Sequence, residues 1–423
     1  MIQKRLWLKI ICACFLVTGL FSGPAFAGGI SLYEFGSPDV GLAAAGWAAR
    51  AQDAATIFTN PAGMSRLEQS QFMGGLQVLY GDVKFDPDSN TTYTGSDGGN
   101  AVGWMPGGSL FVAQKIGKDV NIGFGTLSYF GLGLDYDDDW AGRYFIQEGS
   151  LIGLSIIPAV SYRVTDWLSI GVGLNAMYGM FDNKVALRNP LGSDGKFEYK
   201  DEDWGYGWIA GILLEPKPGT RIGLTYLSEV DLDFSDTTDI GGLGQILTQT
   251  LTRKIDLSIT VPQMVMFSIY HDLNEKWAIM GNIGWQDWSE FGQIFVEIDD
   301  PNGSDPKELT INADYNDTWH ASLGIQYKYS PAWTFSGGMA YDSSAVDDGE
   351  CTVTSPMGES WRFALGAQYA FTPNLILGGA YEFMWLGDMD VNQERGVLGE
   401  RKLEGEFGDA YFHVIALNLT WKY

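Results

Sequence analysis

Apolar and polar positions alternate along most of this chain. Between residues 168 and 180, every even-numbered residue is apolar and the odd-numbered residues are mostly small or polar. One face of the preceding segment carries Ile152, Leu154, Ile156, Val160 and Tyr162. A repeat of two residues predicts β-strands, because successive side chains of a strand point to opposite faces. Both segments are longer than ordinary soluble strands, and a tilted strand needs roughly 9 to 11 residues to cross the hydrocarbon layer of a membrane.

About fourteen such segments follow one another along the chain. They begin near residues 70, 102, 120, 150, 167, 203, 219, 256, 275, 313, 331, 359, 374 and 409. Short connections such as "GKDV", "VTDW" and "DLNEKW" alternate with long polar stretches. The long stretches are residues 82–100, 135–148, 189–203, 236–254, 299–312, 342–357 and 387–406. An even number of strands, with short turns at one end and long loops at the other, is typical of an outer-membrane barrel.

The physical setting requires such a sheet to close. Hydrocarbon offers no hydrogen-bond partner, so an open sheet edge in lipid would leave a row of unpaired backbone groups. We therefore expect an all-β fold, a 14-stranded antiparallel transmembrane outer-membrane β-barrel formed by residues 70–423. The alternative is a set of soluble sandwiches or a propeller, whose strands would be shorter and whose turns would not sort by length.

The first 27 residues have the features of a cleaved export signal. Lys4, Arg5 and Lys9 precede an apolar run over residues 10–21, and "AFA" at residues 25–27 satisfies the small-residue rule for cleavage. Cys12 and Cys14 lie in this segment, so the mature chain keeps only Cys351 and cannot form an internal disulfide. A lipid anchor through Cys14 is the less favoured alternative, because the apolar run before it is short.

Composition and charge narrow the class of protein further. Loss of the three positive charges in the signal changes the net charge from −26 to −29, which disfavours nucleic acid as a partner. The 55 glycines, 15 tryptophans, 20 tyrosines and 23 phenylalanines suit a sheet with aromatic groups on one side and small groups on the other. Trp167, Trp277 and Trp333 directly follow short turns, where an interfacial girdle is expected.

Residues 28–69 lack the alternation and form a separate N-terminal segment. Ser37, with a proline after it, predicts a helix start before an Ala-rich stretch, and residues 56–59 predict a second short helix that Pro61 ends. The segment is too small to have a core of its own. We expect it to pack in the lumen as a small helical hatch. The alternative is an exposed periplasmic tail, in which Trp47 and Phe58 would have nothing to pack on.

Several motifs give this chain a specific resemblance. "GSPDVGLAAAGWAARAQDAATIFTNPAGMSRL" near the N-terminus, followed by "WAGRYF", "PGTRIGLTY", "HDLNEKWAIMGNIGWQDWSEF" and "TWHASLGIQYKYSPAWTFSGGMAYD", is similar to the FadL family of outer-membrane transporters of long-chain fatty acids and other hydrophobic compounds. The last segment, "AYFHVIALNLTWKY", resembles the sorting signal that the barrel assembly machinery reads. The resemblance implies a Gram-negative outer-membrane location and a hatch that contains the motif Asn60, Pro61 and Ala62.

The resemblance also implies a lateral route. Outer loops capture a hydrophobic molecule, which enters the lumen and leaves sideways at an inward kink in the third strand while the hatch moves. The sequence independently predicts weak pairing there, since prolines remove ladder donors and glycines add flexibility. The residues concerned are Pro106, Gly123, Gly125, Gly131, Gly133 and Pro158. The alternative is that they only help the barrel to curve.

Basic residues and one apolar loop are the candidates for ligand contact. Arg163, Arg221, Lys328 and Arg362 on the lumen face, and Arg143 nearer the outer end, could bind a carboxylate. Structural ion pairs are the alternative for each of them, and a neutral hydrocarbon would need none. Long-chain fatty acids are the first expectation, and aromatic or aliphatic hydrocarbons the second. The expected capture residues are Leu243, Ile246, Leu247 and Leu251.

Other functions fit the sequence less well. A lipase or phospholipase needs a histidine base, and His320 is the one of three histidines that could face the lumen, but no serine motif surrounds it. A general porin conflicts with a plugged lumen. Acidic loops such as "DYDDDW" lack calcium-loop spacing and are expected to be solvated. We expect a monomeric, non-enzymatic channel without cofactor or metal, whose partners are a hydrophobic small molecule, outer-membrane lipid, lipopolysaccharide and the assembly machinery.

Overall fold

The computed structural model describes residues 28–33, 35–189, 192–298, 307–347, 349–395 and 401–423. The proposed export signal, residues 1–27, lies outside the described residues. Among the described helices, none is long and apolar enough to cross a membrane.

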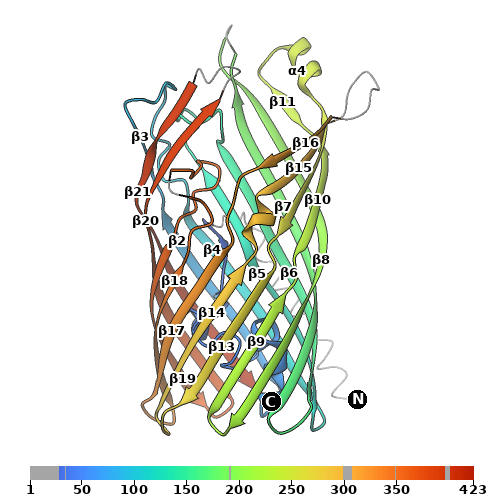
Figure 1. The fold of residues 1–423 in the computed structure, drawn as a ribbon, viewed down its shortest axis with the longest axis vertical. Helices are drawn as coiled ribbons and strands as arrows, with labels where there is room; N and C mark the ends of the chain where they lie inside the picture. The colour runs from blue at the N-terminus through green and yellow to red at the C-terminus, as the bar shows by residue number, and fades with distance from the viewer. Residues whose placement is uncertain (1–27, 34, 190–191, 299–306, 348, 396–400) are drawn as a thin grey trace.

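Fourteen antiparallel strands form a closed ring (Figure 1). Each strand pairs with the next one in the chain, and the ring closes because β21 also pairs with β2. The strands of the ring are β2 (Gln71–Asp82), β4 (Gly103–Ile116), β5 (Val120–Asp135), β6 (Glu148–Arg163), β7 (Leu168–Leu187), β8 (Gly195–Lys217), β9 (Thr220–Leu227), β13 (Met264–Asp272), β14 (Trp277–Gln286), β17 (Thr318–Lys328), β18 (Trp333–Asp342), β19 (Ser360–Thr372), β20 (Leu375–Arg395) and β21 (Arg401–Lys422). The fourteen-stranded barrel predicted from the alternation is confirmed.

The alternation in the sequence corresponds to the two faces of this ring. On β7, Ile170, Val172 and Leu174 are exposed on the outside, whereas Ser169 and Asn175 are buried in the interior. An apolar exterior and a polar interior suit a wall that faces lipid on the outside.

The outer ends of several hairpins extend beyond the predicted strands. We expected loops at residues 189–203 and 387–406, but β8 already begins at Gly195, and β20 and β21 continue through most of the second stretch. Charged residues on these extensions interrupt the apolar alternation, which hides the strands from a hydropathy pattern. Lys200 on β8, for example, binds Asp182 of the neighbouring β7 at 2.9 Å.

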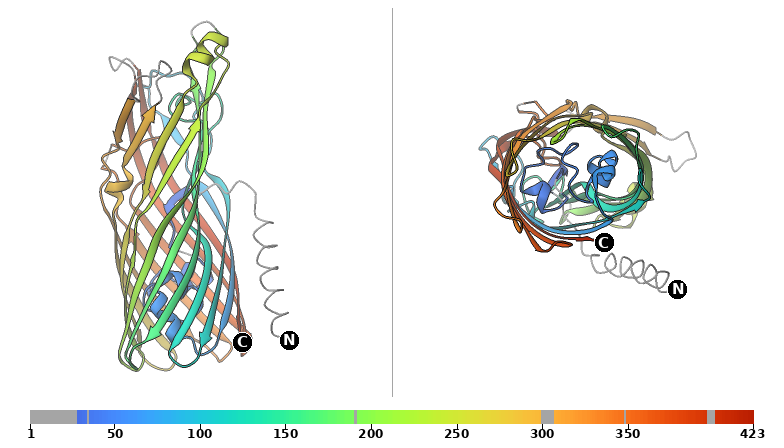
Figure 2. Two further views of the ribbon diagram at one scale, coloured as in Figure 1. Left: turned by 90° about the vertical axis from the view of Figure 1, so that its right-hand side faces the viewer. Right: turned by 90° about the horizontal axis from the view of Figure 1, so that it is seen from below.

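Four strands are interrupted and then continue above the ring. The continuations form a separate four-stranded sheet (Figure 2, left). It contains β10 (Val230–Thr237), β12 (Lys254–Val261), β15 (Gln293–Ile298) and β16 (Lys307–Asn312). The remaining short elements of this outer region are β3 (Phe85–Pro87), β11 (Asp239–Gly241), α4 (Gln245–Leu251) and α5 (Trp288–Phe291).

The N-terminal segment lies inside the ring of strands (Figure 2, right). It contains β1 (Gly28–Ser31), α2 (Ser37–Val40), α3 (Thr56–Thr59) and the 3₁₀ helix η1 (Pro61–Arg66). The short helix predicted at residues 56–59 is confirmed. The helix predicted to start at Ser37 is a single turn capped by Gly36, because Ser37 donates its hydroxyl hydrogen bond to Asn418 of β21 instead.

Candidate functional site: the lumen, its N-terminal segment and a gap in the wall

Asn60 ties the N-terminal segment to itself and to the barrel. Its side-chain nitrogen donates to the carbonyl of Ala48 at 2.7 Å and to that of Ile212 on β8 at 3.0 Å. Its side-chain oxygen accepts from the backbone N–H of Ala62 at 3.0 Å, which caps η1. Pro61 occupies the first turn of this helix, where a missing N–H costs nothing. The Asn-Pro-Ala motif therefore starts a helix and anchors it to the wall.

Glycines on the inner face of the barrel lack the side chains that would overlap the N-terminal segment. A Cβ atom at Gly211 of β8 would overlap the side chain of Asn60, and one at Gly171 of β7 would overlap the Pro61–Ala62 peptide. On the opposite side, a Cβ atom at Gly338 of β18 would overlap the backbone of Leu42. The glycine-rich strands thus form sockets into which the backbone of the segment fits.

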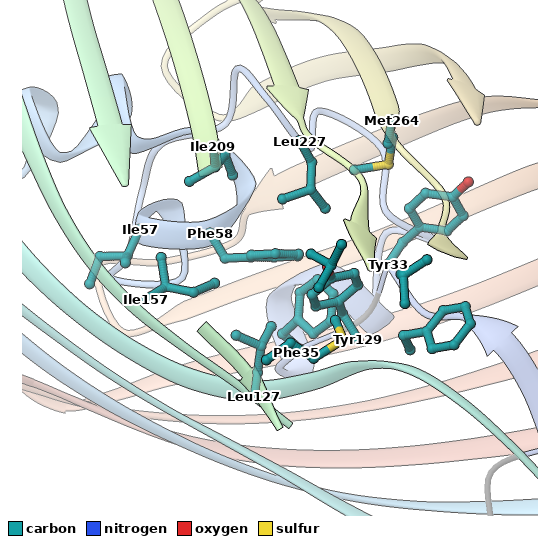
Figure 3. Close-up of a cluster of buried hydrophobic side chains, with 14 of the residues drawn as sticks. Tyr33, Phe35, Ile57, Phe58, Leu127, Tyr129, Ile157, Ile209, Leu227 and Met264 are labelled. Atoms are coloured by element: carbon teal, nitrogen blue, oxygen red, sulfur yellow. The ribbon is translucent and has the colours of Figure 1, made fainter. Parts of the chain in front are cut away.

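Apolar side chains of the segment pack against those of the barrel. Phe58 makes an edge contact with Phe35, at 4.9 Å between ring centroids, and lies against Tyr129 of β5 at the same separation. Figure 3 shows this cluster, in which Ile57 and Phe58 meet Ile157, Ile209 and Leu127 from the strands. The cluster fills part of the lumen with buried hydrophobic groups from the segment and the barrel wall.

The wall is discontinuous between β4 and β5. Their described pairing runs from Ile116 with Val120 to Ser109 with Leu127 and ends there. Beyond it, residues 103–108 of β4 pair only with β2, and β5 has a bulge between Ser128 and Phe130. The seam is therefore open beyond Leu127 and closes again at its outer end, where the N–H of Asp135 on β5 donates to the carbonyl of Ala101 at 2.8 Å.

The strand β1 occupies the edge of β5 that β4 leaves free. Gly28 lies opposite Leu132 and Ser31 opposite Phe130, and the N–H of Leu32 donates to the carbonyl of Tyr129 at 2.9 Å. The beginning of the N-terminal segment thus satisfies the backbone of β5 at the gap. Nothing in the sequence pattern pointed to this strand, because it is four residues long and has no alternation.

The residues predicted at a lateral opening divide into two groups. Pro106, Gly131 and Gly133 belong to the unpaired part of the seam, whereas Gly123 and Gly125 lie in the paired part. A Cβ atom at Gly123 would overlap Ile57 of the N-terminal segment. Pro158 pairs with Phe124 of β5, and the ladder between β6 and β7 skips it.

A cavity of about 120 Å³ lies beside the gap. Leu32 and Tyr33, which follow β1, form part of its lining. Its apolar wall includes Leu79, Val83, Val102, Leu134, Met384 and Phe412. Its polar wall includes Gln286, Thr318, Asp342, Ser343, Ser360 and Arg362.

Tyr33 joins the N-terminal segment to the polar wall. Its ring lies 4.3 Å from that of His320, and the guanidinium of Arg362 is 5.3 Å from its centroid. Its hydroxyl accepts a hydrogen bond from Gln286 at 2.9 Å, and Trp47 donates to its carbonyl at 3.1 Å. Tyr33 is the side chain that fixes the chain directly behind β1.

The basic residues considered for carboxylate binding lie in different places. Arg362 lines the cavity, whereas Arg163 donates to the carbonyl of Ser65, and Arg221 donates to that of Ala49 at 2.9 Å and covers the ring of Tyr270. Lys328 is exposed at the end of β17, away from the cavity. Sequence reasoning identified Arg362 but not its carboxylate neighbours.

Arg143 belongs to the outer loops. It binds Asp194 at 3.0 Å, and Tyr144 donates to the same carboxylate at 2.7 Å. Burial opposes ionisation of Asp194, but the hydrogen bonds from Tyr144 and Arg143 hold its pKa below the ordinary value. The pair is therefore ionised at neutral pH and fixes two loops to each other.

The predicted capture residues lie at α4, at the far end of the outer region (Figure 1). Leu251 is exposed, and Leu243 packs against Gly195 at the start of β8. The side chains of Ile246 and Leu247 lie outside the described residues.

The family described as "Outer membrane protein transport protein (OMPP1/FadL/TodX)" matches residues 18–423. The chain belongs to this family. It is therefore a β-barrel transporter of hydrophobic compounds in the outer membrane of Gram-negative bacteria, and the resemblance seen in the sequence is confirmed.

Two curated relatives of this family member are similar over most of their length. "Outer membrane protein P1" of Haemophilus influenzae is 30% identical over 369 residues, which cover 77% of this chain and 79% of the relative. "Long-chain fatty acid transport protein" of Escherichia coli is 28% identical over 392 residues, which cover 82% of this chain and 84% of the relative.

Solved structures of low sequence identity share the fold of this family member. A FadL homologue of Pseudomonas aeruginosa superposes with a TM-score of 0.84 at 19% identity, covering 93% of this chain and all of that one. The Ralstonia pickettii toluene transporter TbuX gives a TM-score of 0.69 at 19% identity, with 93% and 99% covered.

Proposed function

We propose that this barrel passes hydrophobic molecules from the outer loops into its lumen and out sideways through the β4–β5 gap, with the N-terminal segment acting as a hatch. The observation that carries the proposal is the position of β1. It pairs with β5 where β4 does not, and the residues after it line a cavity that has an apolar and a polar wall. A small shift of one strand would join the cavity to the gap.

The route avoids two unfavourable environments. A hydrophobic molecule crosses the polar lipopolysaccharide layer inside the protein and leaves through the wall instead of through water. The exposed Leu251 of α4 and its neighbours form the proposed first contact. Passage is by diffusion, without a cofactor or an energy source, and we propose a monomer inserted by the barrel assembly machinery.

The N-terminal segment determines when the route is open. In the closed arrangement, β1 satisfies the edge of β5, and Tyr33 holds β1 through its contacts with His320, Arg362 and Gln286. A molecule that enters the cavity competes for the space next to Tyr33. Binding then shifts the population toward an arrangement in which β1 has left the gap, in proportion to the difference in affinity for the two states.

The basic test of the proposal is uptake by cells. A Gram-negative strain that lacks its own member of the family, with and without this gene, is given radiolabelled long-chain fatty acids, alkanes or toluene as the sole carbon source. We expect faster uptake of at least one of these compounds when the barrel is present in the outer membrane. Equal rates with and without a folded barrel, for every compound, would contradict the proposal.

Replacement of Asn60→Ala should loosen the hatch and slow uptake. The change removes two hydrogen bonds to carbonyl groups and the cap of η1, at a cost of about 2 kcal/mol. The barrel should remain folded, because its strands are paired with one another. We expect uptake to fall several-fold, since the segment is no longer held against β8 in the position from which β1 and Tyr33 respond to a ligand. The measurement is uptake rate per folded barrel, judged by heat-dependent electrophoretic mobility.

A matched control for this variant is Asn274→Ala. Asn274 also caps backbone N–H groups, those of Lys276 and Trp277, but does so in an exposed short turn. This variant should take up substrate at the wild-type rate. Unchanged uptake by Asn60→Ala would count against gating by the hatch.

Hydrolysis is a second candidate function, and one observation bears on it. His320 Nδ1 lies 2.7 Å from Asp342, the geometry of the base and acid in a serine hydrolase. In such a site the other ring nitrogen contacts the nucleophile, but His320 Nε2 is buried without a hydrogen-bond partner among the described residues. The pair instead supports the ring of Tyr33, and we propose no catalytic step.

A further inference from the structure

The polar wall of the cavity contains the buried Arg362 and Asp342, and Glu382, which is not among the lining residues, lies next to Arg362. Arg362 on β19 donates from Nε to Asp342 of β18 at 2.9 Å, and its Nη1 lies 3.9 Å from Glu382 of β20. Ser360 donates to the same oxygen of Asp342 at 3.2 Å. Arg362 is 4% exposed and Glu382 is fully buried. The three charged groups therefore interact with one another more than with solvent.

The guanidinium of Arg362 is not available as a positive charge for a ligand, because acidic side chains already pair with it. Among the described residues, the guanidinium of Arg362 lies against two carboxylates, those of Asp342 and Glu382. The fork of Arg362 is occupied on the side of Asp342 by a hydrogen bond and on the side of Glu382 by a near ion pair, and the ring of Tyr33 lies next to it. An anionic head group at this wall would find the guanidinium of Arg362 already engaged by these two carboxylates.

The other arginines described in the lumen are committed as well. Arg50 bridges Asp39 and Asp53 at 2.8 and 2.6 Å, and Arg66 binds Glu215 at 2.7 Å. Arg163 and Arg221 donate to carbonyl groups of the N-terminal segment. Each of these side chains holds the segment together or holds it to the barrel. A carboxylate at one of them would share the guanidinium with a contact that the closed state uses, and Nη2 of Arg221 is buried without a hydrogen-bond partner among the described residues.

We propose that Asp342 and Glu382 are specificity-determining residues, which neutralise Arg362 and so make the cavity accept uncharged hydrophobic molecules and reject carboxylates. The inference rests on the proposed function, because it takes the cavity to be on the route. Burying an ionised carboxylate without a partner is strongly unfavourable. An uncharged head can instead accept or share hydrogen bonds with Ser343, Ser360 or Gln286, and a hydrocarbon needs only the apolar wall.

The size of the cavity agrees with this choice. At about 120 Å³ it is close to an apolar protein cavity of roughly 150 Å³ that binds benzene. One small ring, or the end of an alkyl chain, fills it without further opening.

The test compares two ligands that differ only in the head group, dodecanol and dodecanoate. Uptake of each is measured in the same strain with and without the barrel, at neutral pH. We expect the wild-type protein to raise dodecanol uptake at least ten times more than dodecanoate uptake. Equal stimulation of the two would overturn the inference, whereas stimulation of neither, together with no uptake of any hydrocarbon, would overturn the proposed function as well.

Replacement of Glu382→Gln should change this preference. The side chain keeps its shape but removes one of the two carboxylates described next to Arg362. Dodecanoate uptake should therefore rise about tenfold, while dodecanol uptake stays within twofold of wild type. Asp342→Asn should act in the same direction. The control is Glu275→Gln, which removes one negative charge from an exposed turn and should leave the ratio unchanged. If Glu382→Gln folds and shows the same ratio of dodecanol to dodecanoate uptake as the wild-type protein, the inference is overturned. If a variant does not fold, the ratio measured for the wild-type protein decides the inference.

Discussion

Replacement of Gly338→Val should displace the N-terminal segment and turn a closed barrel into an open pore. A side chain at this position of β18 would overlap the carbonyl, the carbonyl carbon and the Cα atom of Leu42. These are backbone atoms that cannot move away by changing a rotamer, so the segment must shift. We expect ion conductance in planar bilayers to rise at least tenfold. Uptake of hydrophobic substrate should fall to background, because the segment that carries Leu32 and Tyr33 to the cavity is displaced.

The neighbouring residue supplies a matched control. A Cβ atom at Gly337, on the same strand but on the opposite face, would lie 3.5 Å from Leu365, an ordinary contact distance. Gly337→Val therefore changes the same residue type to the same side chain without touching the segment, and conductance should stay low. If Gly338→Val folds and conducts no more than Gly337→Val, then the socket does not hold the segment.

Replacement of Tyr33→Ala should release β1 from the gap. The change removes the ring contact with His320 and the cation–π contact with Arg362, each about 1 kcal/mol. A loss of about 2 kcal/mol increases the open fraction roughly thirty-fold. Hydrogen exchange of the amide of Leu32, which donates to Tyr129 in the closed state, should accelerate by a similar factor. Uptake should become faster and less dependent on substrate concentration.

Tyr33→Phe separates the ring from its hydroxyl. This variant keeps both ring contacts and loses the hydrogen bond from Gln286. Exchange at Leu32 should change only a few-fold. Equal exchange rates in wild type and in Tyr33→Ala would show that Tyr33 does not hold the strand.

The ring of strands was predictable because its physical cause is periodic. A lipid-facing wall imposes an apolar residue at every second position, and Ile170, Val172 and Leu174 show that rule directly in the sequence. The helix at residues 56–59 was predictable for a different reason, since Pro61 restricts Asn60 and ends it. Both signals are local in the sequence, so neither depends on knowing which distant residues contact these elements in the fold.

The gap and the cavity depend on contacts between distant parts of the chain. Pro106 and Gly131 marked weak pairing, but the sequence did not show that β1, about one hundred residues earlier, would pair with β5. Arg362 was visible as a candidate, yet its meaning depends on Asp342 and Glu382, which neighbouring strands bring beside it. The glycines were counted as small groups, whereas several are sockets for the backbone of the N-terminal segment.

The closure of β21 onto β2 has a consequence for biogenesis. The N-terminal segment is synthesised before any strand, and it contacts β5 to β8 at η1 and β19 to β21 at α2. It must therefore stay with the nascent sheet while the later hairpins are added, since a cylinder sealed without it would offer no way in for a folded plug. A chain truncated before β19 would lack the three strands that α2 contacts, so the N-terminal segment has to lie against the sheet before the last strands close the ring.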